Sequence, residues 1–432
     1  MKEKVAVVGG GISGLSAQYF ILSKGFSVEL FEKNDYLGGL AGSINFNNFI
    51  IEKYYHFICG GDSTLIEFSQ KLGIDNKLNF LPTKTAFYYN GKNYPFSGPI
   101  DLLKFSPIPL SSRLKFGFHI LSSKYKKKWG DMDNIPAKEW LFERIGNKSY
   151  QVIWAPLLNI KFGKYHERIS AAWIWHRINR VASSRKGPFS KEKMGFFSGG
   201  THTLISELES RIKKSGGLIH VNSEIKRIEK SKEHFNLLLN SGRQIKVDKV
   251  ILAVPLPIAA KLVENLDSQY AQQLSSIDFL GVRCGIFRLK EKVSDAFWLN
   301  INDPRIAANG LIEYSNLNPL KEISPHKIVY IPFYVTLKNE WYSMDQNSFK
   351  KKLFAMLRLI NPSLTENSIV GFRSFRSPYA QAVCTAGFKS RIPAFRTPVK
   401  NLFLLDSTQL YPSDRTLSAS IANAEKLVAE KF

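Results

Sequence analysis

Closely spaced glycines near the N-terminus are the first residues whose spacing points to chemistry. The apolar residues 4–8 lead directly into Gly9-Gly10-Gly11-Ile12-Ser13-Gly14, which fits G-x-G-x-x-G. The first glycine permits a tight turn, the second lets backbone amides approach a pyrophosphate, and the third lets a helix pack closely on a strand. The residues expected to contact a cofactor here are Gly9, Gly11, Ile12, Ser13 and Gly14.

An acidic residue follows at the spacing that a dinucleotide site requires. Residues 28–31 form a second apolar run that leads into Glu32, 18 residues after Gly14. A carboxylate at this place accepts hydrogen bonds from an adenosine ribose and disfavours a 2′-phosphate, and therefore NADP. We predict strand, glycine turn, helix and strand in that order, with Glu32 and its neighbour Lys33 in a dinucleotide site.

The residues after Glu32 resemble one flavoprotein superfamily. Residues 33–43, KNDYLGGLAGS, carry Gly38, Gly39 and Leu40, and are similar to a motif of the flavin amine oxidase, protoporphyrinogen oxidase and phytoene desaturase superfamily. Tyr36 stands where that motif has arginine, so no phosphate contact of that side chain is implied. Further similar segments are 199–212, 217–228, 247–255 and 399–432. The resemblance implies FAD as the cofactor.

The same resemblance implies three cofactor contacts later in the chain. A strand over 221–225 would place Ile225 beside the adenine. Asp406 would lie beside the flavin ribityl chain, although Leu405 replaces the usual glycine before it. Arg415 would lie at the edge of the active site, where it binds flavin or substrate or pairs with Asp414.

His56 is the first candidate for catalysis. The segment Glu52-Lys53-Tyr54-Tyr55-His56-Phe57 resembles a stretch of UDP-galactopyranose mutase that brings a histidine to the flavin. As a residue that titrates near neutral pH, His56 could exchange a proton with flavin or substrate. The alternative is a histidine packed between its aromatic neighbours.

Aromatic and cationic side chains alternate over residues 154–185. Stacking rings beside fixed cations suit a sugar or an aromatic ring that carries phosphate or carboxylate. Lys161 and Arg177 are the preferred substrate contacts, and Trp173 shares a helix face with Arg177. The alternative is a core helix with snorkelling cations. The whole group comprises Trp154, Lys161, Phe162, Trp173, Trp175, Arg177, Arg180 and Arg185.

A third candidate segment is 371–383, GFRSFRSPYAQAV, in which Arg373 and Arg376 alternate with aromatic residues. In amine oxidases, aromatic residues from this region line the flavin face. The resemblance therefore implies a place for Tyr379 beside the flavin.

Two functions remain open at this stage. The first is an FAD-dependent oxidoreductase that removes a hydride from a C–H bond of a small, anionic substrate, with a place in cell-surface sugar metabolism by analogy. The second is a non-redox sugar isomerase similar to UDP-galactopyranose mutase, in which reduced flavin acts as a nucleophile.

These residues require an α/β chain with two domains of the glutathione-reductase-like FAD type: a Rossmann-type cofactor domain and a substrate domain with a mixed sheet and helices. The expected cofactor domain is discontinuous, over 1–75, 195–262 and 395–432, and the substrate domain covers 76–194 and 263–394. We expect a hairpin at Asn90-Gly91, strands over 286–293 and 326–335, and a helix over 349–360.

Composition limits the remaining possibilities. The chain has 432 residues and a net charge of +24, of which residues 101–200 contribute +12. This charge favours anionic partners, but no nucleic-acid motif is present. Residues 109–129 combine an apolar helical face with lysines, which suits peripheral contact with an anionic membrane or an ordinary surface helix. Three dispersed cysteines, no apparent signal sequence and no metal motif predict a cytoplasmic protein without a metal, at most peripheral to the inner face of the membrane.

Overall fold

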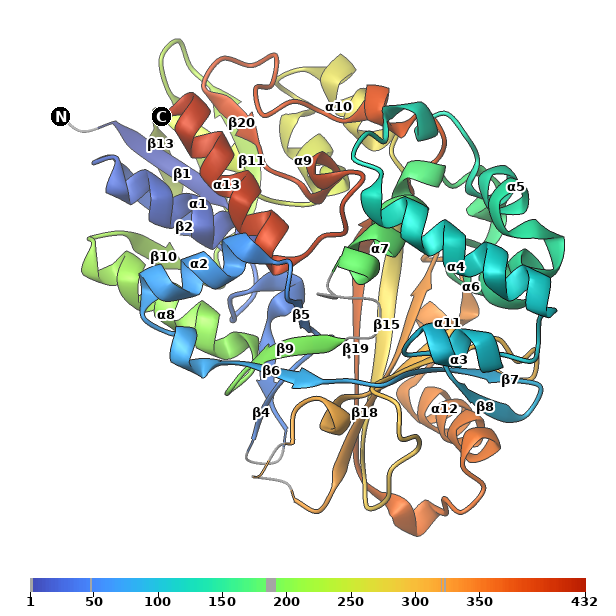
Figure 1. The fold of residues 1–432 in the computed structure, drawn as a ribbon. Coiled ribbons are helices and arrows are strands. Elements are labelled where there is room, and N and C mark those ends of the chain that lie inside the picture. The colour runs from blue at the N-terminus through green and yellow to red at the C-terminus, as the bar shows by residue number, and fades with distance from the viewer. Residues whose placement is uncertain (1–2, 47–48, 184–191, 320, 322–323) are drawn as a thin grey trace.

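A parallel five-stranded sheet holds the glycine turn. The computed structural model describes residues 3–46, 49–183, 192–319, 321 and 324–432. The predicted strand, turn, helix and strand are present as β1, α1 (Ile12–Ser23) and β2 (Figure 1). The sheet runs in the order β10 (Leu218–His220), β2 (Ser27–Phe31), β1 (Lys4–Val8), β14 (Lys249–Leu252) and β20 (Leu402–Leu404).

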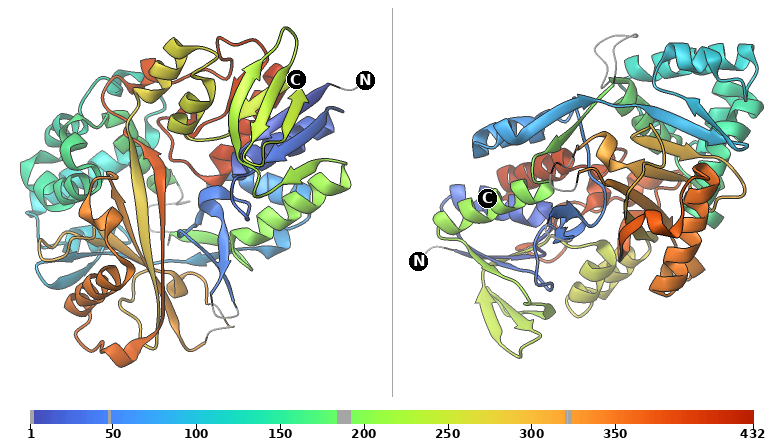
Figure 2. Two further views of the ribbon diagram at one scale, coloured as in Figure 1. Left: turned by 180° about the vertical axis from the view of Figure 1, so that it is seen from behind. Right: turned by 90° about the horizontal axis from the view of Figure 1, so that it is seen from below.

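Both faces of this sheet are covered, which explains its nearly continuous apolar strands. Val5 and Val7 point to one face and Ala6 and Val8 to the other, because side chains alternate along a strand. The first face packs on α1, α2 (Ser63–Leu72), α8 (Thr201–Lys214) and α13 (Leu417–Lys431). The second packs on the small sheet β11 (Ile225–Lys230), β12 (Phe235–Leu239) and β13 (Gln244–Val247), seen from behind in Figure 2, and on α9 (Leu256–Val263) and α10 (Ser268–Ser275).

A second, mixed sheet of seven strands lies below the first in Figure 1. Its order is β19 (Ile369–Ala382), β15 (Phe279–Leu289), β18 (Lys327–Val335), β17 (Gly310–Glu313), β16 (Trp298–Ile301), β7 (Thr85–Tyr89) and β8 (Lys92–Pro95). The expected hairpin joins β7 to β8, and Asn90 and Gly91 both have positive φ. Helix α12 (Gln346–Ile360) covers one face, with α11 (Glu340–Ser343) nearby.

A layer of helices completes the second half of the molecule. It consists of α3 (Pro99–Lys104), α4 (Leu110–Tyr125), α5 (Ala137–Ser149), α6 (Ala155–Phe162) and α7 (Ala171–Ser183). Helix α7 packs on α4, because Trp175 Nε1 and Asn179 Nδ2 both donate hydrogen bonds to the Ser123 carbonyl. Helix α6 packs on β18. Through α6, this layer of helices therefore packs on the seven-stranded sheet.

Two smaller sheets connect the halves. One pairs β3 (Ser43–Asn45) with β4 (Ile50–Glu52), and the other runs in the order β5 (Ile58–Cys59), β9 (Lys193–Phe197) and β6 (Leu78–Pro82).

The predicted segments 1–75, 195–262 and 395–432 supply all five strands of the parallel sheet. We retain this division into cofactor and substrate domains as a proposal, although β6 and β9 pair across it.

Two expected strands have different bounds. Residues 290–293 lie outside β15, which ends at Leu289, because Lys290 and Glu291 sit in an exposed turn. Residues 221–224 form a loop between β10 and β11, because Asn222 adopts a positive φ that no strand permits. Ile225 therefore begins a strand instead of ending one.

Candidate functional site

One cavity of about 520 Å³ runs between the parallel sheet and the seven-stranded sheet. Residues from both chain ends and from both sheets line it. The predicted site residues that line it are Gly9, Gly11, Ile12, Ser13, Glu32, Lys33, Gly38, Gly39, Leu40, His56, Lys161, Arg177, Ile225, Tyr379, Asp406 and Arg415.

The glycine turn shapes one end of the cavity. Gly9 has φ +107°, and a Cβ there would lie 2.4 Å from the Ala253 carbonyl oxygen. A Cβ on Gly14 would lie 1.9 Å from the Gly9 carbonyl oxygen, so Gly14 serves helix packing and does not line the cavity. A Cβ on Gly11 would meet no described atom within 4 Å. Gly11 therefore leaves a cradle open at the N-terminus of α1, which fits a cofactor phosphate.

Glu32 lies at the end of β2 with both carboxylate oxygens already bonded. Its Oε2 accepts a hydrogen bond from the Gly10 amide at 2.7 Å, and its Oε1 accepts from the Asn34 amide at 2.9 Å. Asn34 Nδ2 also donates to Oε1, at 2.6 Å. Because each carboxylate oxygen has two lone pairs, Oε2 retains the capacity to accept from a ribose hydroxyl. The Gly10 bond also fixes the carboxylate against the glycine turn.

The second pair of glycines lies beside the first turn. Gly38 has φ +98°, and its amide donates to the Gly10 carbonyl at 2.8 Å. The Tyr36 ring, which stands in the usual arginine position, lies under the Lys53 ammonium at 3.0 Å from ring centroid to Nζ. Burial lowers the pKa of Lys53.

Asp406 follows β20 and closes the cofactor side of the cavity. Its Oδ1 accepts a hydrogen bond from the Thr408 amide at 2.8 Å. Burial raises the pKa of this carboxyl to about 6, although its hydrogen bonds act in the opposite direction. Helix α13 begins nearby with Thr416 as its N-cap and no acidic residue in its first turn, so its positive end faces the cavity uncompensated.

His56 lies in the cavity wall as a neutral imidazole. Its Nδ1 is 2.7 Å from the Tyr54 carbonyl oxygen, so Nδ1 carries the hydrogen and donates it. Nε2 is then an acceptor, and it has no hydrogen-bond partner among the described residues. Burial lowers the pKa of His56 to about 4. The expectation that His56 titrates near neutral pH is therefore wrong.

Cations gather on the substrate side of the cavity, where three arginines each have a defined partner. Arg177 Nη1 is 3.0 Å from Asp414 Oδ1, and Arg180 Nη2 is 3.1 Å from Asp62 Oδ2. Arg415 Nη1 donates to Gln381 Oε1 at 3.0 Å and does not form an ion pair with its neighbour Asp414.

The carboxyl of Asp414 shows the strength of this positive field. Burial alone would raise its pKa, but Arg177, Lys161 and two further arginines outweigh burial and hold the pKa at about 2. Asp414 is therefore ionised throughout the physiological range.

Lys161, at the last turn of α6, is surrounded by rings. Its Nζ lies 5.0 Å from the centroid of Trp173 and 4.7 Å from that of Tyr334. Burial and the nearby Arg177 and Arg415 hold the pKa of Lys161 well below its usual value. The predicted face shared by Trp173 and Arg177 is present, with the guanidinium 4.8 Å from the ring centroid.

The other predicted residues divide between cavity and core. Tyr379 lines the cavity and packs its edge against Phe279. Trp175 is buried under α4 and does not line it, because its indole donates to the Ser123 carbonyl. Arg185 lies outside the described residues.

Arg373 and Arg376 point to opposite sides of β19, as residues an odd number apart do. Only Arg376 lines the cavity, whereas Arg373 lies 5.4 Å from the Phe46 ring.

Sequence reasoning missed several cavity residues, namely Tyr55, Asp62, Trp298, Tyr334 and Gln381. Tyr55 lies next to the predicted His56, and Gln381 follows the predicted Tyr379 by two residues. Trp298 and Tyr334 reach the cavity only through strand pairing, which no local pattern reveals. Among the described residues, no group of three His, Cys, Asp or Glu could hold a metal ion. No helix in the described ranges is long and apolar enough to span a membrane.

Comparison with known proteins identifies a family. The family described as flavin containing amine oxidoreductase matches residues 12–406, about nine-tenths of the chain. Coproporphyrinogen III oxidase of Staphylococcus aureus is 23% identical over 292 residues, which are 59% of this chain and 61% of that protein. Protoporphyrinogen oxidase of Dictyostelium discoideum is 23% identical over 349 residues, 65% of each protein. The chain spans about three-fifths of the length of these curated relatives.

Solved structures share the fold over nearly the whole chain. An oxidoreductase from Methanosarcina mazei has a TM-score of 0.75 at 17% identity, covering 99% of this chain and 100% of that one. Cyclohexylamine oxidase from Brevibacterium oxydans has a TM-score of 0.72 at 16% identity, covering 100% and 98%. The family match confirms the predicted superfamily and FAD as its cofactor, and the solved structures confirm the two-domain α/β fold. The resemblance to UDP-galactopyranose mutase stays a prediction.

Proposed function

The chain belongs to the flavin containing amine oxidoreductase family, and we propose that it removes a hydride from a C–H bond of a small anionic substrate. One observation carries the proposal: the residues expected to hold FAD and a cluster of four cations line the same cavity. The cations are Lys161, Arg177, Arg180 and Arg415. Among the described residues, Asp414 pairs with Arg177 and Asp62 pairs with Arg180.

We assign the cofactor to the glycine end of the cavity. The open cradle at Gly11, the acceptor Glu32 and the positive end of α13 beside Asp406 fit the pyrophosphate, the ribose and the flavin in turn. Bound FAD supplies the two-electron acceptor for C–H oxidation. The full set proposed to contact it is Gly9, Gly11, Ile12, Ser13, Glu32, Lys33, Gly38, Gly39, Leu40, Ile225, Asp406 and Arg415.

The chain's own residues position the substrate. Arg177 and Lys161 attract its anionic group and fix its orientation in the cavity. His56 presents Nε2 as an acceptor for a substrate N–H or O–H, while the Tyr54 carbonyl holds the proton on Nδ1. With a pKa of about 4, His56 stays neutral at pH 7, so it orients a donor and does not supply a proton. Tyr379 forms part of the wall beside this position.

A sugar isomerase is the second candidate, because His56 and the cations would also suit a nucleotide sugar. Anaerobic mixing of the FAD-loaded protein with carboxylated amines, porphyrinogens and nucleotide sugars separates the two. Loss of the oxidised flavin absorbance with one of these compounds supports the oxidoreductase. Conversion of a nucleotide sugar only after chemical reduction, with no net electron transfer, supports the isomerase and overturns the first proposal. A role in cell-surface sugar metabolism rests on the same test.

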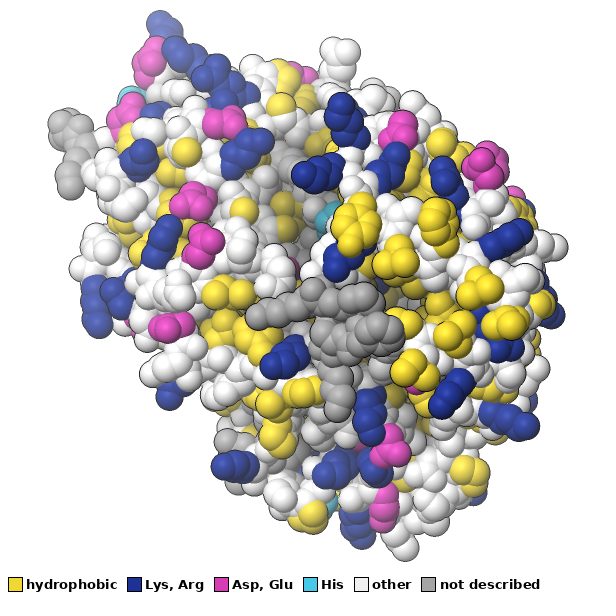
Figure 3. All heavy atoms as spheres, in the orientation of Figure 1, with side chains coloured by type: hydrophobic (Ala, Val, Ile, Leu, Met, Phe, Trp, Pro, Cys, Tyr) yellow, Lys and Arg dark blue, Asp and Glu magenta, His cyan; other side chains and the backbone are white. Residues whose placement is uncertain are grey.

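We also propose peripheral contact with the inner face of an anionic membrane through residues 109–129, in a cytoplasmic protein. Helix α4 buries Phe116 and His119 but exposes a stripe of apolar side chains, including Phe118 at 73% and Tyr125 at 75%. Figure 3 shows hydrophobic and basic side chains gathered over this region. Such a combination suits a lipid surface. All three cysteines are buried and unpaired, as in proteins of reducing compartments.

A further inference from the structure

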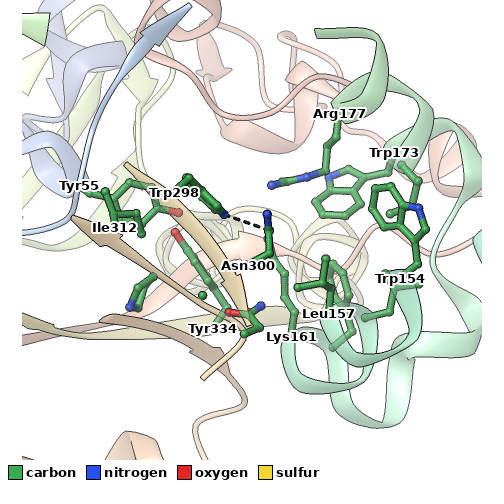
Figure 4. Close-up of a pocket in the computed structure, with 16 residues that line it drawn as sticks. Tyr55, Trp154, Leu157, Lys161, Trp173, Arg177, Trp298, Asn300, Ile312 and Tyr334 are labelled. Atoms are coloured by element: carbon green, nitrogen blue, oxygen red, sulfur yellow. Dashed lines mark hydrogen bonds between the residues drawn. The ribbon is translucent and has the colours of Figure 1, made fainter. Parts of the chain in front are cut away.

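A side pocket of about 90 Å³ opens from the cavity between α6, α7 and the seven-stranded sheet. Figure 4 shows Trp298 and Asn300 on one side, Trp154 and Trp173 on the other, and Lys161 between them. Lys161, Arg177, Trp298 and Tyr334 line both the side pocket and the main cavity. A ligand in the main cavity can therefore reach into the pocket.

The ammonium of Lys161 is the unusual feature of this pocket. Among the described residues it forms no hydrogen bond and no ion pair, although its side chain is only partly exposed and lines both spaces. Its neighbours are the rings of Trp173 and Tyr334, at 5.0 and 4.7 Å from Nζ to the centroids. Burial and the neighbouring arginines disfavour the ammonium form of Lys161 and lower its pKa. An anionic ligand beside Nζ would stabilise that form and gain the charge as a partner.

Asp414 attracts Lys161 through space but forms its ion pair with Arg177. Asp414 is engaged by Arg177 at 3.0 Å, and Arg415 bonds to Gln381 instead. Arg177 also stacks on Trp173, with its guanidinium 4.8 Å from the ring centroid. Lys161 and Arg177 thus lie at the boundary of the two spaces, where Asp414 pairs with Arg177.

The walls favour a flat ring. Trp154, Trp173 and Trp298 surround the pocket with aromatic faces and edges, and rings stack on such surfaces. The Trp298 indole is held by Asn300 Oδ1 at 3.1 Å, so its orientation is fixed. The volume is smaller than an engineered 150 Å³ cavity that holds benzene. A ring that enters from the main cavity therefore fits into the side pocket only in part, and the rest of the ligand stays in the main cavity.

We propose that this side pocket binds a flat ring of the substrate that carries a carboxylate or a phosphate, with the oxyanion paired to Lys161. The inference rests on the proposed function, because it assigns the substrate to the same cavity. It narrows the substrate class to ring compounds with a directly attached oxyanion.

Binding of simple probes to the FAD-loaded protein tests this assignment without turnover. Benzoate and phenyl phosphate carry the two oxyanions, and benzyl alcohol is the neutral counterpart. Tryptophan fluorescence and calorimetry measure their binding. We expect at least one anionic probe to bind at least about tenfold more tightly than benzyl alcohol, which is about 1.4 kcal/mol. The tighter of the two anions identifies the oxyanion.

Lys161 and Lys164, three residues apart in the chain, provide a matched pair of variants. Lys161→Gln should weaken binding of the anionic probe at least about tenfold and leave benzyl alcohol unchanged. Lys164→Gln removes the same charge from an exposed side chain that lies over the Tyr165 ring and outside both cavities, and should leave both unchanged. Equal binding of anionic and neutral probes, equal effects of the two variants, or no binding of either anion would overturn the proposal.

The outcome is independent of the oxidoreductase test. Lysine-dependent probe binding without any substrate that bleaches the flavin would support the pocket and count against the proposed reaction. Flavin bleaching by a substrate that binds equally well to Lys161→Gln would support the reaction and overturn the pocket.

Discussion

A methyl group added at Gly11 should weaken FAD binding without weakening the apoprotein. Gly11 is the N-cap of α1 with φ −71° and ψ 176°, an extended conformation that alanine adopts freely. The new Cβ would meet no described atom within 4 Å and would project into space beside the helix N-terminus. Gly11→Ala therefore changes the cradle and leaves the packing unchanged.

The expected changes in apoprotein stability and in FAD affinity follow from the allowed backbone conformation of Gly11 and from the open space beside it. Replacing glycine by alanine in an allowed conformation stabilises a fold by about 0.4–1 kcal/mol, because the unfolded chain loses freedom. A methyl group that displaces a phosphate from one backbone amide removes a charge-assisted hydrogen bond of about 1.5–3 kcal/mol. FAD should then bind about ten- to a hundredfold more weakly.

Flavin fluorescence quenching measures the FAD affinity, and urea unfolding of the apoprotein measures its stability. Gly14→Ala is the contrasting variant, because its Cβ would lie 1.9 Å from the Gly9 carbonyl oxygen and should destabilise the apoprotein itself. Gly61→Ala, exposed and without contacts within 4 Å, is the neutral control. Unchanged FAD affinity in Gly11→Ala, or a loss of apoprotein stability equal to that of Gly14→Ala, would refute the assignment.

Three further changes test other parts of the structure. Glu32→Ala should weaken FAD binding about tenfold or more while the protein stays folded, and full flavin loading after purification would contradict the role given to Glu32. Burial raises the pKa of Glu313 to about 8. The protonated side chain therefore stabilises the folded state fully near pH 4, and this stabilisation is lost as the pH rises towards 8. The loss is about 1.4 kcal/mol for each pH unit between the unfolded and the folded pKa. Urea unfolding of wild type and Glu313→Gln at pH 5 and pH 8 should show the variant gaining relative stability at the higher pH, whereas a constant difference would exclude the effect. Phe118→Glu should reduce cosedimentation with phosphatidylglycerol vesicles, whereas Leu359→Glu, on the exposed side of α12, should not; equal behaviour of the two variants would remove α4 from the contact.

Local patterns were sufficient for the cofactor half of the site. The glycine turn, Glu32 and Asp406 each follow a strand whose apolar residues are contiguous in the chain, and strand ends in a parallel sheet meet at one edge. In the cofactor half, the position of each residue directly after a strand therefore predicts that these residues meet in space.

The substrate half depended on contacts between distant residues. Arg177 meets Asp414, 237 residues later, and neither neighbourhood reveals the other. The pKa of His56 depends on burial by the assembled cavity, so its residue type alone was misleading. Trp173 and Trp175 belong to the same aromatic helix, and only the packing of α4 on α7 shows that Trp175 is core.

The five-stranded sheet imposes an order on assembly. Its central strand β1 lies between β2, a close neighbour in sequence, and β14, which is more than two hundred residues away, and β20 joins only beyond β14. Closing such long loops costs conformational entropy before the strands make stabilising contacts. The pairings of β1 with β14 and of β14 with β20 therefore form slowly. A ligand that contacts both the glycine turn after β1 and Asp406 after β20 would connect the N-terminal and C-terminal segments of this sheet. Binding of the cofactor would then stabilise the paired arrangement of these distant segments.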